Sequence, residues 1–283
     1  MTPGPDLSFL AHEVEDVAIS TTTSTLPTKS VKLSTIAHSA GTLVLDASSI
    51  TTDFDALRFE AAAFEQLRID NVNIDGNANT NSDTGPKSSP SVTSDESQKQ
   101  LSTWLISSPY NTPNHYLDLT TLSLPSLVFA KALTALKPVR PDYATASYTS
   151  ALNFPTILSL VRGFAADEGY TWKEVSFYVV VFRSKLKESS DGDWLYRLDF
   201  ESHGEACERG GLLKYWFGKV DGERKNLATC FWHSREHARL GGLGPWHKKA
   251  RAAGRELYDY INFSTHRFTI LDGAVDFRFE DWE

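Results

Sequence analysis

The stretch EVSFYVVVFRSKL, residues 174–186, is the clearest indicator of the fold class of this chain. It is rich in β-branched and aromatic residues, which is typical of a strand inside a sheet. Helical and strand patterns alternate after it: a helix over 193–208, strands over 212–220 and 226–232, a helix from Pro245 to about Ile261, and strands over 266–271 and 275–279. This β-α-β-β-α-β order predicts an α+β domain with the split βαβ of ferredoxin-like folds.

The residues before this stretch are less regular. The predicted elements there are a strand over 42–46, a helix over 54–67, a strand over 115–119, and helices over 124–136 and 154–168. A low-complexity stretch rich in Asn, Ser, Thr and Asp interrupts them and cannot bury enough apolar surface to offset the entropy of ordering. We therefore divide the chain into an extra amino-terminal α/β segment (1–75), a disordered linker or loop (76–100) and the α+β domain (101–283).

Composition and charge narrow the classes of function. The formal net charge of the 283 residues is −8, and such a chain lacks the cation excess that binds nucleic acid or an anionic membrane surface. No apolar run approaches the roughly 20 residues of a membrane helix, and the amino terminus has no basic region of a signal peptide. Two cysteines do not make a disulfide scaffold. We expect a soluble cytoplasmic protein without nucleic-acid or membrane partners.

Aromatic side chains gather on the predicted strands. Alternate residues of a strand share a face, so some of these rings form the core and others face a ligand. The set expected to line a ligand pocket is Tyr215, Trp216, Trp232, Tyr178 and Phe182. Plain core packing accounts for half of such a set by alternation alone.

His247 is the candidate catalytic residue. It follows Gly244-Pro245-Trp246 at the start of a predicted helix, where the helix dipole disfavours a charged imidazolium. A neutral imidazole beside an aromatic cavity is suited to act as a general base or to ligate haem iron. The alternative is that His247 only caps the helix or packs under Trp246.

Two residue pairs are candidate metal ligands, one of a histidine and a cysteine and one of two histidines. His203 and Cys207 are four residues apart on a predicted helix, and His233 and His237 have the same spacing. Such donors suit zinc, but the spacing matches no established zinc motif, so no metal site is predicted. His203, flanked by Glu201 and Glu205, is instead expected on a solvated charged face.

The segment from Asn226 to Ile270 carries a resemblance to a known domain. A strand ends in Phe231-Trp232, Ser234 follows, and Pro245-Trp246-His247 opens a helix. This arrangement resembles the second half of a dimeric α/β-barrel domain, as in antibiotic-biosynthesis monooxygenases. In addition, GGLLKYWFG (210–218) and the segment 230–251 resemble an uncharacterised family of fungal proteins.

The resemblance implies a fold and a range of chemistries. The barrel superfamily includes cofactor-free oxygenases, haem-degrading enzymes, haem-dependent dehydratases, isomerases and proteins without known activity, so it does not name a reaction. It implies a small-molecule ligand, haem as a candidate cofactor and a homodimer. The extra amino-terminal half could instead take the place of the partner subunit. Residues 1–75 either complete the barrel or form a separate domain, and the sequence leaves both alternatives open.

Two hypotheses of different classes follow. The leading hypothesis is a small-molecule-binding enzyme of the α/β-barrel type that acts on an apolar or aromatic metabolite, by oxygenase-, dehydratase- or isomerase-like chemistry. The alternative is a non-catalytic module that binds a ligand or a protein through an exposed face of the sheet. A closed cavity with converging polar groups favours the enzyme, whereas a flat apolar patch favours the module.

Overall fold

The computed structural model describes residues 53–59 and 104–282. The predicted strand over 42–46, the end of the helix predicted over 54–67 and the predicted linker over 76–100 lie outside these residues. Of that helix, the structure describes α3 (Phe54–Phe59).

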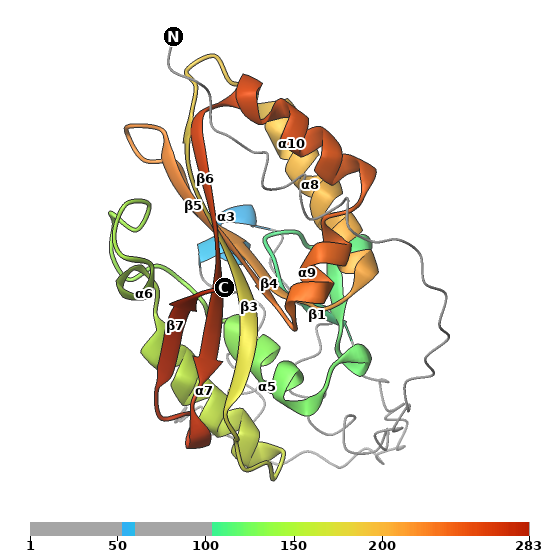
Figure 1. Cartoon of the computed structure of the whole chain (residues 1–283), viewed down its shortest axis with the longest axis vertical. Helices are drawn as coiled ribbons and strands as arrows, with labels where there is room; N and C mark the ends of the chain where they lie inside the picture. The colour runs from blue at the N-terminus through green and yellow to red at the C-terminus, as the bar shows by residue number, and fades with distance from the viewer. Residues whose placement is uncertain (1–52, 60–103, 283) are drawn as a thin grey trace, which may run out of the picture.

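A five-stranded antiparallel sheet forms the centre of the domain (Figure 1). Its strands are β3 (Val175–Leu186), β4 (Leu212–Phe217), β5 (Lys225–Trp232), β6 (Tyr258–Ile270) and β7 (Phe277–Asp281). Their order in the sheet is β4-β5-β3-β6-β7. The first strand of the unit, β3, therefore lies between the third and the fourth, which is the arrangement of the split βαβ. The predicted ferredoxin-like α+β fold is confirmed.

Three helices cover one face of this sheet: α8 (Gly192–Arg209), α9 (Arg235–Gly241) and α10 (Pro245–Leu257). Figure 1 shows α8 and α10 lying side by side. The prediction that the last helix reaches Ile261 and that the next strand begins at His266 was wrong, because β6 begins at Tyr258. Residues 260–270 pair along almost the whole of β3, from Lys185↔Tyr260 to Val175↔Ile270. This ladder outweighs the local helical pattern.

Two helices cover the opposite face: α5 (Leu124–Leu133) and α7 (Phe154–Asp167), with the short α6 (Tyr148–Ala151) nearby. Phe129 of α5 packs on Phe177 and Phe268, at ring-centroid distances of 4.4 and 5.7 Å. Phe154 of α7 lies 5.0 Å from Phe268. The same chain thus covers the face on which a second subunit could pack, and the homodimer stays a prediction.

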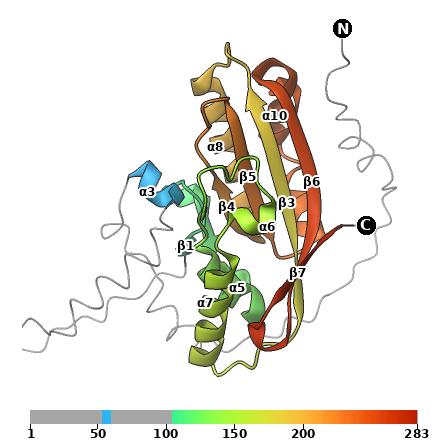
Figure 2. The same ribbon diagram turned by 90° about the vertical axis from the view of Figure 1, so that its left-hand side faces the viewer.

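A two-stranded sheet lies beside β4 (Figure 2). It consists of β1 (Trp104–Ile106) and β2 (Tyr116–Asp118), and the backbone N–H of Tyr215 donates to the carbonyl of Ser107 at 2.9 Å. This contact places the segment 107–115 against α8. The remaining short 3-10 turns are Pro113–His115, Leu119–Thr121 and Asp272–Ala274. None of the described helices is long and apolar enough to span a bilayer.

A buried ion pair connects α5 with the carboxyl end of α7. Lys131 Nζ lies 3.1 Å from Glu168 Oε1, and the two side chains are 2% and 5% exposed.

Lys131→Met leaves Glu168 without this partner and should destabilise the protein by about 3–5 kcal/mol. Urea unfolding measures this loss, and Lys131→Met/Glu168→Leu should recover most of it. Arg278→Met, which breaks the exposed pair with Glu174, should cost under about 1 kcal/mol; an equal cost at both sites would contradict the prediction.

Candidate functional site

A row of polar side chains on α8 faces the sheet. Asp199, His203 and Cys207 are spaced four residues apart, so they share one face of the helix. Tyr215 of β4 and the segment 107–115 lie opposite them. The prediction that His203 lies on a solvated face was wrong, because the residue is only 5% exposed. Packing of the segment 107–115 on α8 buries it.

Asp199 accepts hydrogen bonds from two tyrosines. Tyr110 donates to Oδ2, and Tyr215 donates to Oδ1 at 2.5 Å. Burial raises the pKa of Asp199, and the two hydrogen bonds oppose that rise. Burial and the nearby carboxylate raise the pKa of both tyrosines far above the ordinary value. Both tyrosines therefore stay protonated and serve as hydrogen-bond donors.

His115 and His203 form a second buried pair beside Asp199. Their Nδ1 atoms are 2.7 Å apart, so one nitrogen donates while the other accepts. Burial lowers the pKa of His115 to about 4. Burial, followed by the charges of His115 and His247, lowers the pKa of His203 well below its ordinary value. Both rings are thus neutral at neutral pH, and they must differ in tautomer.

Cys207 does not supply a reactive thiolate at this site. Its Sγ lies 3.6 Å from His203 Nδ1, but burial raises the pKa of the thiol to about 12. The thiolate is the form that attacks substrates and binds metals. Among residues 53–59 and 104–282, no group of three His, Cys, Asp or Glu side chains converges to hold a metal ion. A carboxylate held by two phenol hydroxyls and two neutral imidazoles are groups that can exchange protons.

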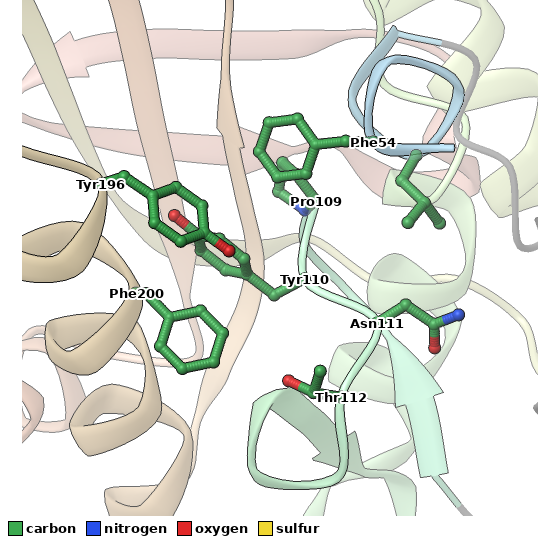
Figure 3. Close-up of a pocket in the computed structure, with 8 residues that line it drawn as sticks. Phe54, Pro109, Tyr110, Asn111, Thr112, Tyr196 and Phe200 are labelled. Carbon is green, nitrogen blue, oxygen red and sulfur yellow. The ribbon is translucent and has the colours of Figure 1, made fainter. Parts of the chain in front are cut away.

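An aromatic groove opens next to the cluster (Figure 3). Its volume is about 160 Å³, and its walls come from α3, the segment after β1, and α8. We call it the aromatic groove; its lining residues are Phe54, Leu57, Pro109, Tyr110, Asn111, Thr112, Tyr196 and Phe200. In Figure 3, Tyr110 lies between Phe54 on one side and Tyr196 and Phe200 on the other. A cavity of roughly 150 Å³ is large enough for benzene, so one aromatic ring fits.

Tyr110 connects the groove with the buried cluster. Its ring centroid lies 5.2 Å from Phe200, a wall of the groove, and 5.2 Å from His203 behind it. Its hydroxyl donates to Asp199. A ligand in the groove therefore lies beside the tyrosine that holds the buried carboxylate.

His247 lies at the start of α10 and is held by Glu205 of α8. Its Nδ1 is 3.0 Å from Glu205 Oε2, and the carboxylate also accepts the backbone N–H groups of Trp246 and His247 at 2.7 and 3.1 Å. The pKa of His247 is lowered mainly by burial, and Glu205 opposes this effect. The residue does not line the aromatic groove, so its catalytic role stays a prediction.

The five predicted pocket aromatics divide between the two faces of the sheet. Tyr178, Phe182, Tyr215 and Trp232 pack together on the face covered by α8 and α9. Trp216 lies on the opposite face, where its Nε1 donates to the carbonyl of Arg58 at 2.6 Å. None of the five lines the aromatic groove. Tyr215 is the one of the five that donates a hydrogen bond to Asp199.

The other histidine pair lies at the end of β5. His233 Nδ1 contacts Ser126 Oγ at 2.5 Å, and His237 Nδ1 contacts Ser234 Oγ at 2.8 Å. Sequence reasoning missed Tyr110 and His115, because the segment 107–115 shows no motif, and it also missed Phe200 of α8. The four-residue spacing of Asp199, His203 and Cys207 could have indicated a shared helix face.

Comparison with known proteins gives a family match. A family model described as PB2B2.08-like matches residues 106–281. The chain is similar to UPF0643 protein PB2B2.08 of Schizosaccharomyces pombe, with 35% identity over 196 residues that make up 66% of this chain and 88% of the yeast protein. The match includes the aromatic groove apart from its α3 wall.

Likenesses to solved structures are more distant. SnoaB, a cofactor-independent oxygenase from Streptomyces nogalater, is 11% identical with a TM-score of 0.28, and the match covers 32% of this chain and 91% of SnoaB. An antibiotic biosynthesis monooxygenase from Chloroflexus aurantiacus is 22% identical with a TM-score of 0.26, covering 32% and 89%. Neither likeness bears on the chemistry of the site.

The cap that holds His247 can be tested by substitution. A Cβ on Gly244 would lie 2.1 Å from Glu205 Oε2, so Gly244→Ala should expel the carboxylate. Glu205→Ala should cost about 0.5–2 kcal/mol, as for other lost caps. In urea unfolding, Gly244→Ala alone should lower the free energy of unfolding by at least as much as Glu205→Ala does. When Glu205 is already Ala, adding Gly244→Ala should cause almost no further loss. Gly242→Ala, whose Cβ would be 3.5 Å from its nearest neighbour, is the control. Additive losses would contradict this contact.

The buried histidine pair should make the protein sensitive to acid. The unfolded chain binds protons on these histidines below about pH 6.5, whereas the folded His115 does so only near pH 4. Stability is therefore fully present above this window and falls as the pH falls through it, by about 3 kcal/mol for His115 alone. Urea unfolding at several pH values measures the slope.

A double variant isolates this contribution. His115→Leu/His203→Leu removes both partners and should reduce the slope between pH 6.5 and 4, leaving the share of the other histidines whose pKa burial lowers, His233, His247 and His266. Tyr148→Phe removes a buried hydroxyl bonded to Thr229 and has no group that titrates in this range, so it should keep the slope. An unchanged slope in the double variant would disprove the assignment.

Proposed function

This chain belongs to the PB2B2.08-like family, and we propose that it binds a small apolar or aromatic metabolite in the aromatic groove and acts on it by proton transfer. The single observation that carries this proposal is the position of Tyr110. Its ring forms part of the groove, and its hydroxyl donates to the buried Asp199. A ligand ring in the groove would thus lie against an acid–base pair.

The walls of the groove suit one flat ring. Phe54, Tyr196 and Phe200 line the groove with aromatic rings, and Phe54 and Tyr196 contact each other edge to face at a centroid distance of 6.3 Å, so a ligand ring could add a contact of the same kind. Aromatic pairs prefer such offset and edge-on contacts. Asn111 and Thr112 add an amide and a hydroxyl at one end of the groove, where a polar substituent of the ligand could be bound.

The proton would move through Tyr110. As the phenol accepts a proton from the substrate, it passes its own proton to Asp199, and Tyr215 keeps its hydrogen bond to the other carboxylate oxygen. Burial supports the protonated state because it raises the pKa of Asp199. Oxygenase-, dehydratase- and isomerase-like reactions that begin with removal of a substrate proton would all use this step.

Haem does not fit this groove. Pockets for drug-sized ligands and cofactors have volumes of roughly 300–1,000 Å³, and the volume of this groove is about 160 Å³. The candidate haem ligand, His247, does not line the groove. The proposed chemistry therefore includes no haem.

Binding is tested with two probes of similar size, phenol and toluene. Calorimetry should detect both, with phenol bound more tightly because its hydroxyl can contact the Tyr110–Asp199 pair. Tyr110→Phe keeps the ring and should abolish the preference while toluene still binds. Phe200→Trp should fill the groove and weaken both probes, and Tyr148→Phe should change neither. Undiminished binding to Phe200→Trp would place the ligand elsewhere.

Proton transfer is tested by hydrogen exchange of a carbon acid. In D₂O, the protein should catalyse exchange of the α-protons of acetophenone, followed by NMR. Tyr110→Phe and Asp199→Asn should each reduce this catalysed rate by about 10²–10⁴-fold, with acetophenone affinity nearly unchanged. Binding without catalysed exchange would remove the enzymatic role and leave the non-catalytic module, in which the groove only binds its ligand.

A further inference from the structure

The charge of the chain is unevenly distributed. Against the total of −8, residues 235–255 contain six basic side chains and one acidic side chain. These residues form α9, the turn after it and most of α10. The expectation of no anionic membrane partner rests on the total charge, which hides this local excess of cations. The basic residues are Arg235, Arg239, Lys248, Lys249, Arg251 and Arg255.

Two leucines are exposed where α9 meets α10. Leu240 is 37% and Leu243 is 47% exposed. Lys248 and Lys249 lie only four and five residues after Gly244, the N-cap of α10. With a rise of about 1.5 Å per residue, they are within about 8 Å of the turn along the helix axis. We call this surface the α9–α10 turn, defined by Leu240, Leu243, Lys248 and Lys249.

Trp246 follows three residues after Leu243 and packs between α8 and α10. Trp246 is partly buried, and its ring is 3.7 Å from Lys249 Nζ and 5.3 Å from the Arg197 guanidinium carbon. Trp, Leu and Lys or Arg together are the residues that peripheral proteins place at the boundary between lipid headgroups and acyl chains.

The nearby acids do not offset the cations of the turn. Glu236 pairs with Arg239, with Arg239 Nη2 2.8 Å from Glu236 Oε1. Glu205 faces inward and accepts the N–H groups at the start of α10. Lys248 and Lys249 are exposed, so their ammonium groups can reach a negatively charged surface.

We propose that the α9–α10 turn docks the protein on the surface of an anionic lipid bilayer. Leu240 and Leu243 enter the headgroup layer, and Lys248 and Lys249 contact the lipid phosphates. Charge complementarity and the exposed leucines favour this occupant. A nucleic acid would match the cations but would leave the leucines without an apolar partner. None of the four residues that define the α9–α10 turn lines the aromatic groove.

Vesicle co-sedimentation of the full chain tests this proposal. The protein should sediment with vesicles of phosphatidylserine and phosphatidylcholine, not with phosphatidylcholine alone, and added salt should release it. Lys248→Glu/Lys249→Glu should weaken binding by about 30-fold, since each basic residue near such a surface is worth about 1 kcal/mol. Leu240→Ser/Leu243→Ser should weaken it by about tenfold.

A matched variant controls for net charge. Lys173→Glu/Lys185→Glu makes the same charge change on β3 and the segment before it, away from the turn, and should bind like the unchanged protein. No sedimentation with anionic vesicles, or equal sedimentation with phosphatidylcholine alone, overturns the proposal. So does a Leu240→Ser/Leu243→Ser protein that binds fully and is displaced by DNA, which would identify a general polyanion surface.

Discussion

The pairing of β3 with a neighbour on each side is the constraint on which the rest of the structure depends. It forms ladders with β5 and with β6 along most of its length. Phe177 and Val179 therefore enter the core with α5 and α7, while Tyr178 and Val180 enter the core with α8 and α9. A shift of one residue would exchange the two sets, so this register determines which helices can pack on each face.

The buried cluster exists because α8 meets a segment from far earlier in the chain. Burying a carboxylate is costly unless it is hydrogen-bonded, and Asp199 receives Tyr110 from the segment after β1 and Tyr215 from β4. His115 arrives on the same segment and pairs with His203. Packing thus places the Tyr110–Asp199 pair beside the histidine pair, with the Tyr110 ring 5.1 Å from His115 and 5.2 Å from His203.

Different faces of α8 serve different parts of the molecule. Tyr196 and Phe200 form a wall of the aromatic groove, and Asp199 and His203 lie behind it. Glu205 holds the start of α10, and Gly244 leaves room for that carboxylate. One helix therefore positions both the proposed ligand site and the basic turn, so substitutions on it must be compared face by face.

The sequence by itself determined the class of fold and most of its elements. The β-branched and aromatic stretch over 174–186 and the helix and strand patterns that follow it are local signals, and local signals specify local structure. The end of α10 escaped this reasoning because pairing with β3 overrides the helical pattern of residues 258–261. Alternation required Tyr215 and Trp216, as neighbours on one strand, to face opposite sides of the sheet, but it could not say which of the two faces α5 and α7 and which faces α8.

Only the tertiary structure decided the site. Tyr110 and Asp199 are 89 residues apart, and His115 and His203 are 88 apart. The periodicity of a sequence predicts single helices and strands. It cannot predict a contact between residues this far apart in the chain, because such a contact depends on where two elements pack against each other. The sequence drew attention to His247, whose position at a helix start is local, whereas the acid–base pairs beside the groove arise from packing.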